Sequence, residues 1–226
     1  MIPAQFENTL SIGRMMRVLW ITVGVLLGMH VILSFVHYQM HELPWMVRQI
    51  FDVDEEDSFP TWYSAIALFI TSAVLWINAR AHRQSGSSLR LHWYGLALGF
   101  LFLSVDEIAG MHETLNGEIE ISWAIPGGIV ALIVGVAYLS FLAKLPRGTA
   151  VWFVIGGAVF VGGAVGVELF TERYLHNDEL DTLAYYLWNG LEEGMEMAGV
   201  LIFLHAVLQS MKGHAPSLPL TFTLTD

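Results

Sequence analysis

Six long runs of apolar residues, separated by short polar segments, make up most of this sequence. A membrane-spanning helix needs about 20 mostly apolar residues, and each run has about that length. The runs predict spans over residues 18–38, 61–79, 91–115, 123–143, 150–174 and 182–209. The sequence therefore predicts an all-α integral membrane bundle of about six transmembrane helices.

The polar segments between the runs are short, and none resembles a linker between domains. We expect residues 1–212 to form a single six-span transmembrane domain and residues 213–226 a loosely ordered cytoplasmic tail. After the first span, Pro44 and the apolar residues that follow it predict a short interfacial helix. The acidic run over residues 52–57 lacks the central glycine and final glutamate of a calcium loop. We expect that run to be a solvated loop.

The basic residues orient the six spans. Only Arg48 and Arg173 fall on one side, whereas eight basic residues fall on the other: Arg14, Arg17, Arg80, Arg83, Arg90, Lys144, Arg147 and Lys212. The positive-inside rule places the side with more Lys and Arg in the cytoplasm. The sequence thus predicts that both termini are cytoplasmic and that most acidic residues lie toward the periplasm or exterior.

Composition supports the membrane assignment and excludes several functions. The chain of 226 residues is 55% hydrophobic and only 14% charged, which is too apolar for an ordinary soluble domain. It has no cysteine, so disulfides, thiolate metal sites and cysteine nucleophiles are excluded. A net charge of −11 without a basic cluster argues against nucleic acid. The expected partners are the lipid bilayer and either further copies of this chain or a larger membrane complex.

Carboxylates within the predicted spans are the most informative chemical feature. A charged side chain at the bilayer centre costs about 2.5–3.5 kcal/mol on insertion scales. At about 1.5 Å per helical residue, the deepest acids of the third, fifth and sixth spans converge on one layer in the outer half of the membrane. They are Asp106, Glu107, Glu168, Glu193 and Glu196. Each of the three helices can turn a single polar face inward.

Histidines of the first span lie at an overlapping depth. His30, Ser34, His37 and His41 form one stripe at helical spacing. His112 points away from the face of Asp106 in an ideal helix, but can approach it if the helix unwinds near Gly110. Oxygen and imidazole ligands without thiolates suit one or two divalent ions of Zn, Mn or Fe. The predicted metal ligands are Asp106, Glu113, Glu168, Glu193, Glu196, His30 and His112, with Glu107 and His37 as catalytic base or supporting residue.

Glycines within the apolar runs predict close helix packing rather than a nucleotide loop. They fall in two sets, one in the fifth span and one in the sixth. The fifth span contains Gly156, Gly157, Gly162, Gly163 and Gly166, and the sixth a stripe of Gly190, Gly194 and Ala198.

Three strings, FDVDEEDSFPTWYSA, FLFLSVDEIAGMHE and LEEGMEMAGVLIFL, resemble those of a family of small uncharacterised bacterial multipass membrane proteins. The resemblance covers most of the chain. It implies a membrane location, for which we expect the cytoplasmic (inner) membrane, and attaches no established activity. There is also a looser similarity to di-metal carboxylate bundles, from which this sequence departs by having no Glu-x-x-His.

These features leave several functions open. The first is a metal-binding membrane protein whose ion activates water for a lipidic or membrane-delivered substrate; whether the chain is an enzyme is undecided. The second is a proton or cation transporter that uses the same acids, although no inverted repeat is visible. The third is a non-catalytic subunit of a larger membrane complex. A purely structural network of protonated acids is the alternative to all three.

Overall fold

The computed structural model of the chain is all-helical over the residues that it describes, which are 11–112, 114, 122–177 and 179–214. A π-helical segment, η1 (Gly162–Val167), continues α7 into α8, so that these elements form one long helix. The helices follow along the chain as α1 (Ile12–Gln39), α2 (Trp45–Phe51), α3 (Phe59–Gln84), α4 (Arg90–Ala109), α6 (Ala124–Leu142), α7 (Arg147–Val161), α8 (Glu168–His176) and α9 (Leu183–His214).

Five of these segments are long and apolar enough to cross a membrane: α1, α3, α6, the α7–η1–α8 segment and α9. They confirm the predicted all-helical, multipass membrane character. The remaining predicted span corresponds to α4, which has 20 residues but carries Asp106 and Glu107 near its end. It is not among the five, so a sixth span stays a prediction. Helix α4 also ends at Ala109 rather than at residue 115, because Gly110 adopts a left-handed conformation.

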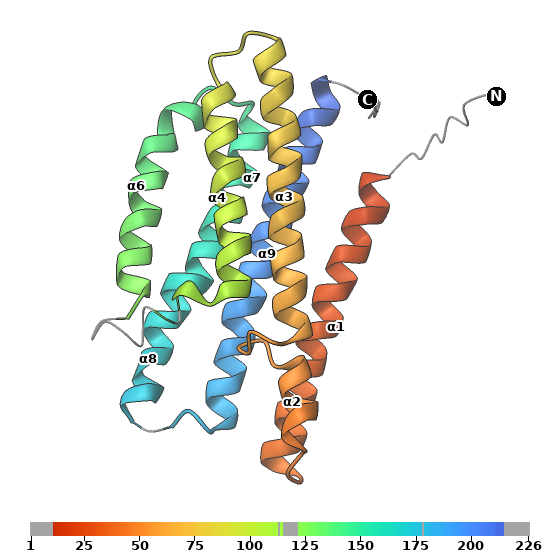
Figure 1. Ribbon diagram of the computed structural model, residues 1–226, viewed down its shortest axis with the longest axis vertical. Coiled ribbons are helices and arrows are strands. Elements are labelled where there is room, and N and C mark those ends of the chain that lie inside the picture. The colour runs from red at the N-terminus through yellow and green to blue at the C-terminus, as the bar shows by residue number, and fades with distance from the viewer. Residues whose placement is uncertain (1–10, 113, 115–121, 178, 215–226) are drawn as a thin grey trace, which may run out of the picture.

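Helix α9 is the central element of the bundle. It contacts α1, α3, α7, η1 and α8, and in Figure 1 it runs behind the antiparallel pair formed by α3 and α4. Two clusters of buried side chains surround it. One cluster joins α3, α4, α6, α7 and α9 through Leu75, Trp93, Phe141, Phe153 and Val207, and the other joins α1, α3 and α9 through Met16, Leu68, Met197, Leu201 and Leu204.

Glycines allow α9 to approach its neighbours closely. A Cβ added to Gly199 would lie 2.6 Å from the backbone nitrogen of Phe160, and one added to Gly156 would lie 3.0 Å from the carbonyl oxygen of Gly199. On another face, a Cβ on Gly194 would lie 3.0 Å from Leu27 of α1. Close backbone contact is the usual way in which membrane helices pack, since lipid is as apolar as their side chains. Gly156 and Gly194 thus pack helices closely, as the sequence predicts, whereas a Cβ on Gly157 or Gly166 would meet nothing within 4 Å.

The two ends of the bundle differ in charge. Helix α1 begins and α9 ends at the upper end in Figure 1, where the α3–α4 and α6–α7 turns also lie. These turns and helix ends contain the eight basic residues that the sequence places on one side. We call this the basic end, and the opposite end, where α4 stops and α8 and α9 meet, the acidic end.

The segment between α2 and α3 folds back into the bundle. The predicted short helix forms as α2, but the acidic run after it is not simply solvated: Asp52 and Val53 are only 6% and 3% exposed. We call residues 52–58 the acidic segment. Two local hydrogen bonds stabilise its conformation. The amide of Asp54 donates to Asp52 Oδ1 over 3.3 Å, and Ser58 caps α3 by accepting from the amide of Thr61 over 3.3 Å. The prediction of a solvated loop holds for the exposed Asp54, Glu55 and Asp57 but not for the buried Asp52 and Val53.

Candidate functional site

A pocket at the acidic end gathers ionisable side chains from separate parts of the chain. We call it the acidic pocket; its lining residues are Val53, Asp54, Glu56, Thr61, Glu107, His112 and Glu193. The acidic segment, the start of α3, the end of α4, the turn after α4 and the middle of α9 each supply part of its wall. Carboxylates and an imidazole therefore share one small space.

Gly110 builds one wall of the acidic pocket. Its φ of 52° is left-handed and ends α4, and the chain then turns back so that His112 Nδ1 lies 3.0 Å from Asp106 Oδ2. The sequence predicts this approach only if the helix unwinds near Gly110, as it does. A Cβ on Gly110 would also lie 1.3 Å from Glu56 Oε1. Glycine is the residue that tolerates a positive φ without steric strain, and here it also leaves room for the Glu56 carboxylate.

The acids of α9 lie among acids from other elements. Glu193 interacts electrostatically with Glu196, Glu107, Glu192 and Asp54. Glu192 and Glu168 form a hydrogen bond between their side chains, and two carboxyl groups can do so only if one of them holds a proton. The backbones are close here as well, because a Cβ on Gly163 of η1 would lie 2.7 Å from the carbonyl oxygen of Glu192.

Asp54 connects the acidic segment to this group. Its Oδ2 accepts a hydrogen bond from the hydroxyl of Tyr185 over 3.3 Å. The side chain keeps accessible surface toward the acidic pocket, yet protein surrounds it on its other sides. This burial, followed by the nearby carboxylates of Asp52 and Glu168, raises the pKa of Asp54 to about 7. Asp54 is thus poised to exchange a proton or accept a cation near neutral pH.

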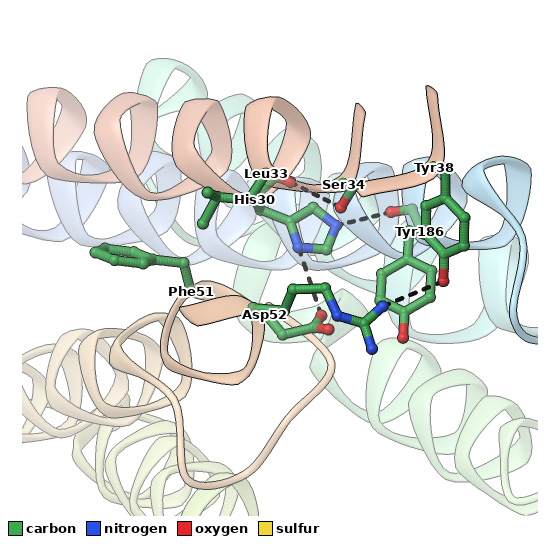
Figure 2. A pocket seen from close by; sticks show the side chains of 8 residues that line it. His30, Leu33, Ser34, Tyr38, Phe51, Asp52 and Tyr186 are labelled. Carbon is green, nitrogen blue, oxygen red and sulfur yellow. Dashed lines mark hydrogen bonds and ion pairs between the residues drawn. The ribbon is translucent and has the colours of Figure 1, made fainter. Parts of the chain in front are cut away.

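A second pocket is lined by Asp52, at the beginning of the same acidic segment. Figure 2 shows the side chains around it, which belong to α1, α2, the acidic segment and α9; they are His30, Leu33, Ser34, Tyr38, Arg48, Phe51, Asp52 and Tyr186. His30, at 2% exposed, is at its centre. Its Nε2 lies 2.8 Å from the carbonyl oxygen of Tyr186, and its Nδ1 lies 3.4 Å from the amide nitrogen of Val53.

Polar contacts at this second pocket join α1 to α2, α9 and the acidic segment. Asp52 Oδ1 lies 3.4 Å from His30 Nδ1, and burial raises the pKa of Asp52 to about 6. Arg48 Nη1 donates to the hydroxyl of Tyr38 over 3.4 Å, and that hydroxyl donates to Asp181. The first helix is therefore tied to α9 by polar groups as well as by packing.

The structure brings several of the predicted site residues together. Glu193, His112 and the predicted base Glu107 line the acidic pocket. Asp106 contacts His112 from just outside it. Glu168 and Glu196 interact electrostatically with each other and with Glu192. The α4, α8 and α9 acids thus meet at one end of the bundle.

The histidines of α1 are placed differently. His30 lies in the second pocket, with its ring nitrogens toward a carbonyl and an amide, so its contacts do not support a ligand role. His37 Nδ1 accepts from the amide of Leu43 over 2.9 Å and stabilises the turn after α1. Glu113 lies outside the described residues.

No ready-made metal centre exists in the part of the chain that the structure describes. There, no three His, Asp or Glu side chains are arranged so that they could hold one ion. Several candidates there are engaged by neighbours instead: Asp106 by His112, Asp54 by Tyr185 and Glu192 by Glu168. The prediction that these acids form a metal-binding cluster is therefore not supported by their described positions.

Sequence reasoning missed the residues of the acidic segment that line the pockets: Asp52, Asp54 and Glu56. A usable signal was the alternation of apolar and acidic residues from Phe51 to Asp54, which is unlike a solvated run because Val53 needs burial. The Ser58–Thr61 cap before α3 also fixes where the segment must end.

The fold and its apolar helices define the class of protein: a multipass, all-helical integral membrane protein with an acidic pocket at one end of the bundle. The chain belongs to the family described as a domain of unknown function (DUF8692), whose model matches residues 18–211. That match agrees with the membrane protein family that the three sequence strings resemble, to which no activity is attached. No curated protein and no solved structure matches the chain.

Proposed function

We propose that this integral membrane protein binds a divalent cation of the Zn, Mn or Fe class in the acidic pocket. The observation that carries the proposal is the pair formed by His112 and Asp106, 3.0 Å apart. Metal-binding histidines usually donate one ring N–H to a carboxylate, which fixes the ring and leaves the other nitrogen as the ligand. In neutral His112, donation from Nδ1 to Asp106 leaves the lone pair on Nε2, and the ring lines the acidic pocket.

The carboxylates around His112 supply the remaining ligands. Glu107, Glu193, Glu56 and Asp54 line the same pocket. Imidazole together with carboxylate oxygens suits Zn, Mn and Fe, and no thiolate is present to favour softer ions. Compared with the sequence-based ligand set, this set keeps His112 and Glu193, adds Asp54 and Glu56, and leaves out His30.

Electrostatics favours a cation at this position. Glu193 is surrounded by the acids Glu196, Glu107, Glu192 and Asp54, and like charges in a medium of low dielectric constant strongly disfavour ionisation. A divalent ion relieves this repulsion and allows several carboxylates to ionise together. Binding requires the Asp54 and Glu193 side chains to rotate toward a common point, so that Asp54 exchanges its contact with Tyr185 for the ion.

Metal content tests the proposal. The chain is purified in detergent, incubated with Zn, Mn or Fe, freed of excess ion and analysed by mass spectrometry, beside Glu193→Gln and Asp57→Asn. Glu193 lines the acidic pocket, whereas Asp57 is an exposed acid of the acidic segment that does not. We expect tightly held ions in the wild type and in Asp57→Asn, with loss of the metal in Glu193→Gln.

Two other results would overturn the proposal. Equal metal content in all three proteins would place the ion outside the acidic pocket. A wild-type protein that holds none of these ions would favour the second candidate function, proton binding for a transport step. The carboxyl contact between Glu168 and Glu192 supports that alternative, because two such groups can hold one proton between them.

The orientation that we propose puts the acidic pocket on the periplasmic or exterior side of the cytoplasmic membrane. It is supported by the gathering of the basic turns, the start of α1 and the end of α9 at the opposite end of the bundle (Figure 1). Helix α4 acts as the sixth span in this arrangement, since it runs antiparallel to α3 between the two ends.

A further inference from the structure

We propose that His30 is the positioning residue of the acidic pocket: its imidazole docks the acidic segment against α1 and α9, so that Asp54 and Glu56 reach the cation. This inference rests on the proposed function. His30 does not bind the ion in this assignment, in contrast to the sequence-based expectation. It acts through the backbone of residues 52–54.

The hydrogen-bond partners of His30 fix its tautomer. A carbonyl oxygen can only accept, so the 2.8 Å contact with the Tyr186 carbonyl requires Nε2 to carry the hydrogen. In the neutral ring Nδ1 is then the acceptor, and the amide of Val53 donates to it over 3.4 Å. One nitrogen thus holds α9 while the other holds the acidic segment.

The surroundings of His30 are built for this contact. The ring is 2% exposed, and a Cβ on Gly190 of α9 would lie 3.1 Å from its Cδ2. A larger residue at position 190 would therefore crowd the imidazole. Asp52 Oδ1 lies 3.4 Å from Nδ1 and also accepts from the amide of Asp54 over 3.3 Å. His30 thus holds the segment through the Val53 amide, and Asp52 holds the next residue through the Asp54 amide.

The acidic segment is held at both ends of its pocket-lining stretch. His30 and Asp52 hold its beginning, and Glu56 packs against the backbone of Gly110 near its end. Between these anchors, Asp54 reaches the hydroxyl of Tyr185 on α9. Loss of the contacts made by His30 should therefore make Asp54 mobile. Helices α4 and α9 would still hold Glu107 and Glu193 in place.

Two substitutions separate the roles of the ring nitrogens. In His30→Asn, Oδ1 occupies the place of Nδ1 and can still accept from Val53, but the donor to Tyr186 is lost. In His30→Gln, Nε2 can still donate to the Tyr186 carbonyl, but the acceptor for Val53 is lost. His205→Gln is the control, since His205 is exposed on α9 and pairs with Gln209.

The first measurement is cation affinity in detergent, with Zn²⁺ as the probe. Loss of a residue that orients a metal ligand typically weakens binding about 10- to 100-fold, and we expect such a loss in His30→Gln. We expect His30→Asn and His205→Gln to stay within about threefold of the wild type, because a retained hydrogen bond to the segment preserves most of that orienting effect. Equal losses in His30→Asn and His30→Gln, with equal drops in unfolding temperature, would make His30 a packing residue and overturn the inference.

The second measurement is amide hydrogen exchange over residues 52–58, which needs no cation. We expect faster exchange in His30→Gln than in His30→Asn or the wild type, because only the glutamine variant loses the Val53 acceptor. If wild-type protein fails to bind Zn²⁺, the proposed function fails, and the exchange data still decide whether His30 docks the segment. Unchanged exchange in His30→Gln would overturn the docking itself.

Discussion

Gly110 shows how one residue can set the form of the acidic pocket. Its left-handed φ of 52° ends α4 and directs the chain so that His112 meets Asp106. Its missing side chain also leaves the space that the Glu56 carboxylate occupies. Any other residue would have to strain the backbone and displace Glu56 together. The imidazole and one carboxylate of the pocket thus depend on the same position.

Replacement of Gly110 by alanine should therefore damage both the fold and the site. The left-handed backbone costs an L residue about 1–2 kcal/mol, and the new Cβ must displace Glu56. We expect a lower free energy of unfolding in detergent and a reduced metal content. Gly99→Ala is the control on the same helix, because a Cβ there meets open space and its φ is not positive. Wild-type stability and metal content in Gly110→Ala would contradict the described turn.

At the residue scale, the sequence predicts helical acids better than loop acids. Glu193 and Glu196 share a face because a helix repeats every 3.6 residues, so their meeting with Glu107 follows from depth and angle. Asp54 and Glu56 lie in the acidic segment, where no periodicity tells which side chains turn inward. His30 was predicted as a metal ligand, but its described partners are backbone groups, which a sequence pattern does not display.

At the scale of elements, α7 and α9 pack backbone against backbone. A Cβ on Gly199 would lie 2.6 Å from the Phe160 nitrogen and 2.7 Å from the Gly156 carbonyl oxygen. These atoms belong to the backbone and cannot rotate away as a side chain can. The contact also sets where η1 and α8 lie against α9, and hence where Glu168 meets Glu192.

A methyl group at position 199 should force α7 and α9 apart. Overpacking of a tight contact typically costs about 1–3 kcal/mol, and we expect Gly199→Ala to lower the unfolding temperature in detergent accordingly. Gly157→Ala, on the neighbouring face of α7 where a Cβ meets nothing within 4 Å, should leave that temperature unchanged. Equal unfolding temperatures for the two variants would argue against a backbone contact at Gly199.

The limits of sequence reasoning at this scale follow from local geometry. The helices match the predicted spans because apolar length determines a spanning helix, and the glycine stripes correctly predict close packing. The end of α4 was misplaced, since the hydropathy of residues 110–115 carries no sign of the left-handed turn at Gly110. The π-helical segment η1 was not predicted, because a single widened turn adds no distinct periodicity.

At the scale of the molecule, charge is divided between the two ends of the bundle. The basic end carries the α3–α4 and α6–α7 turns, whereas the acidic end carries both pockets and the acidic segment (Figure 1). The large aromatic and aliphatic cluster around Trp93, Phe141 and Val207 fills the half toward the basic end.

Cysteine labelling tests the proposed orientation directly. The chain has no native cysteine, so each introduced thiol is the only one. Ser88 lies exposed between α3 and α4, and Asn177 lies exposed after α8. We expect a membrane-impermeant maleimide to label Asn177→Cys in intact spheroplasts, and Ser88→Cys only after permeabilisation. The reverse labelling pattern would mean that the chain has the opposite membrane orientation, with the acidic pocket on the cytoplasmic side.

Helix α6 lies at the edge of the bundle with only Ala124 and Phe141 buried. Side chains such as Ile129, Leu132 and Val136 are exposed on the outside of the described bundle, on a surface that membrane lipid would contact. Lipid tails accept apolar groups of any shape, so mutation can exchange these residues with little selection against it. Evolution of this protein should thus drift quickly in the identity of α6 residues and slowly in their polarity, whereas the pocket-lining Asp54 and Glu56 of the acidic segment should change in neither respect.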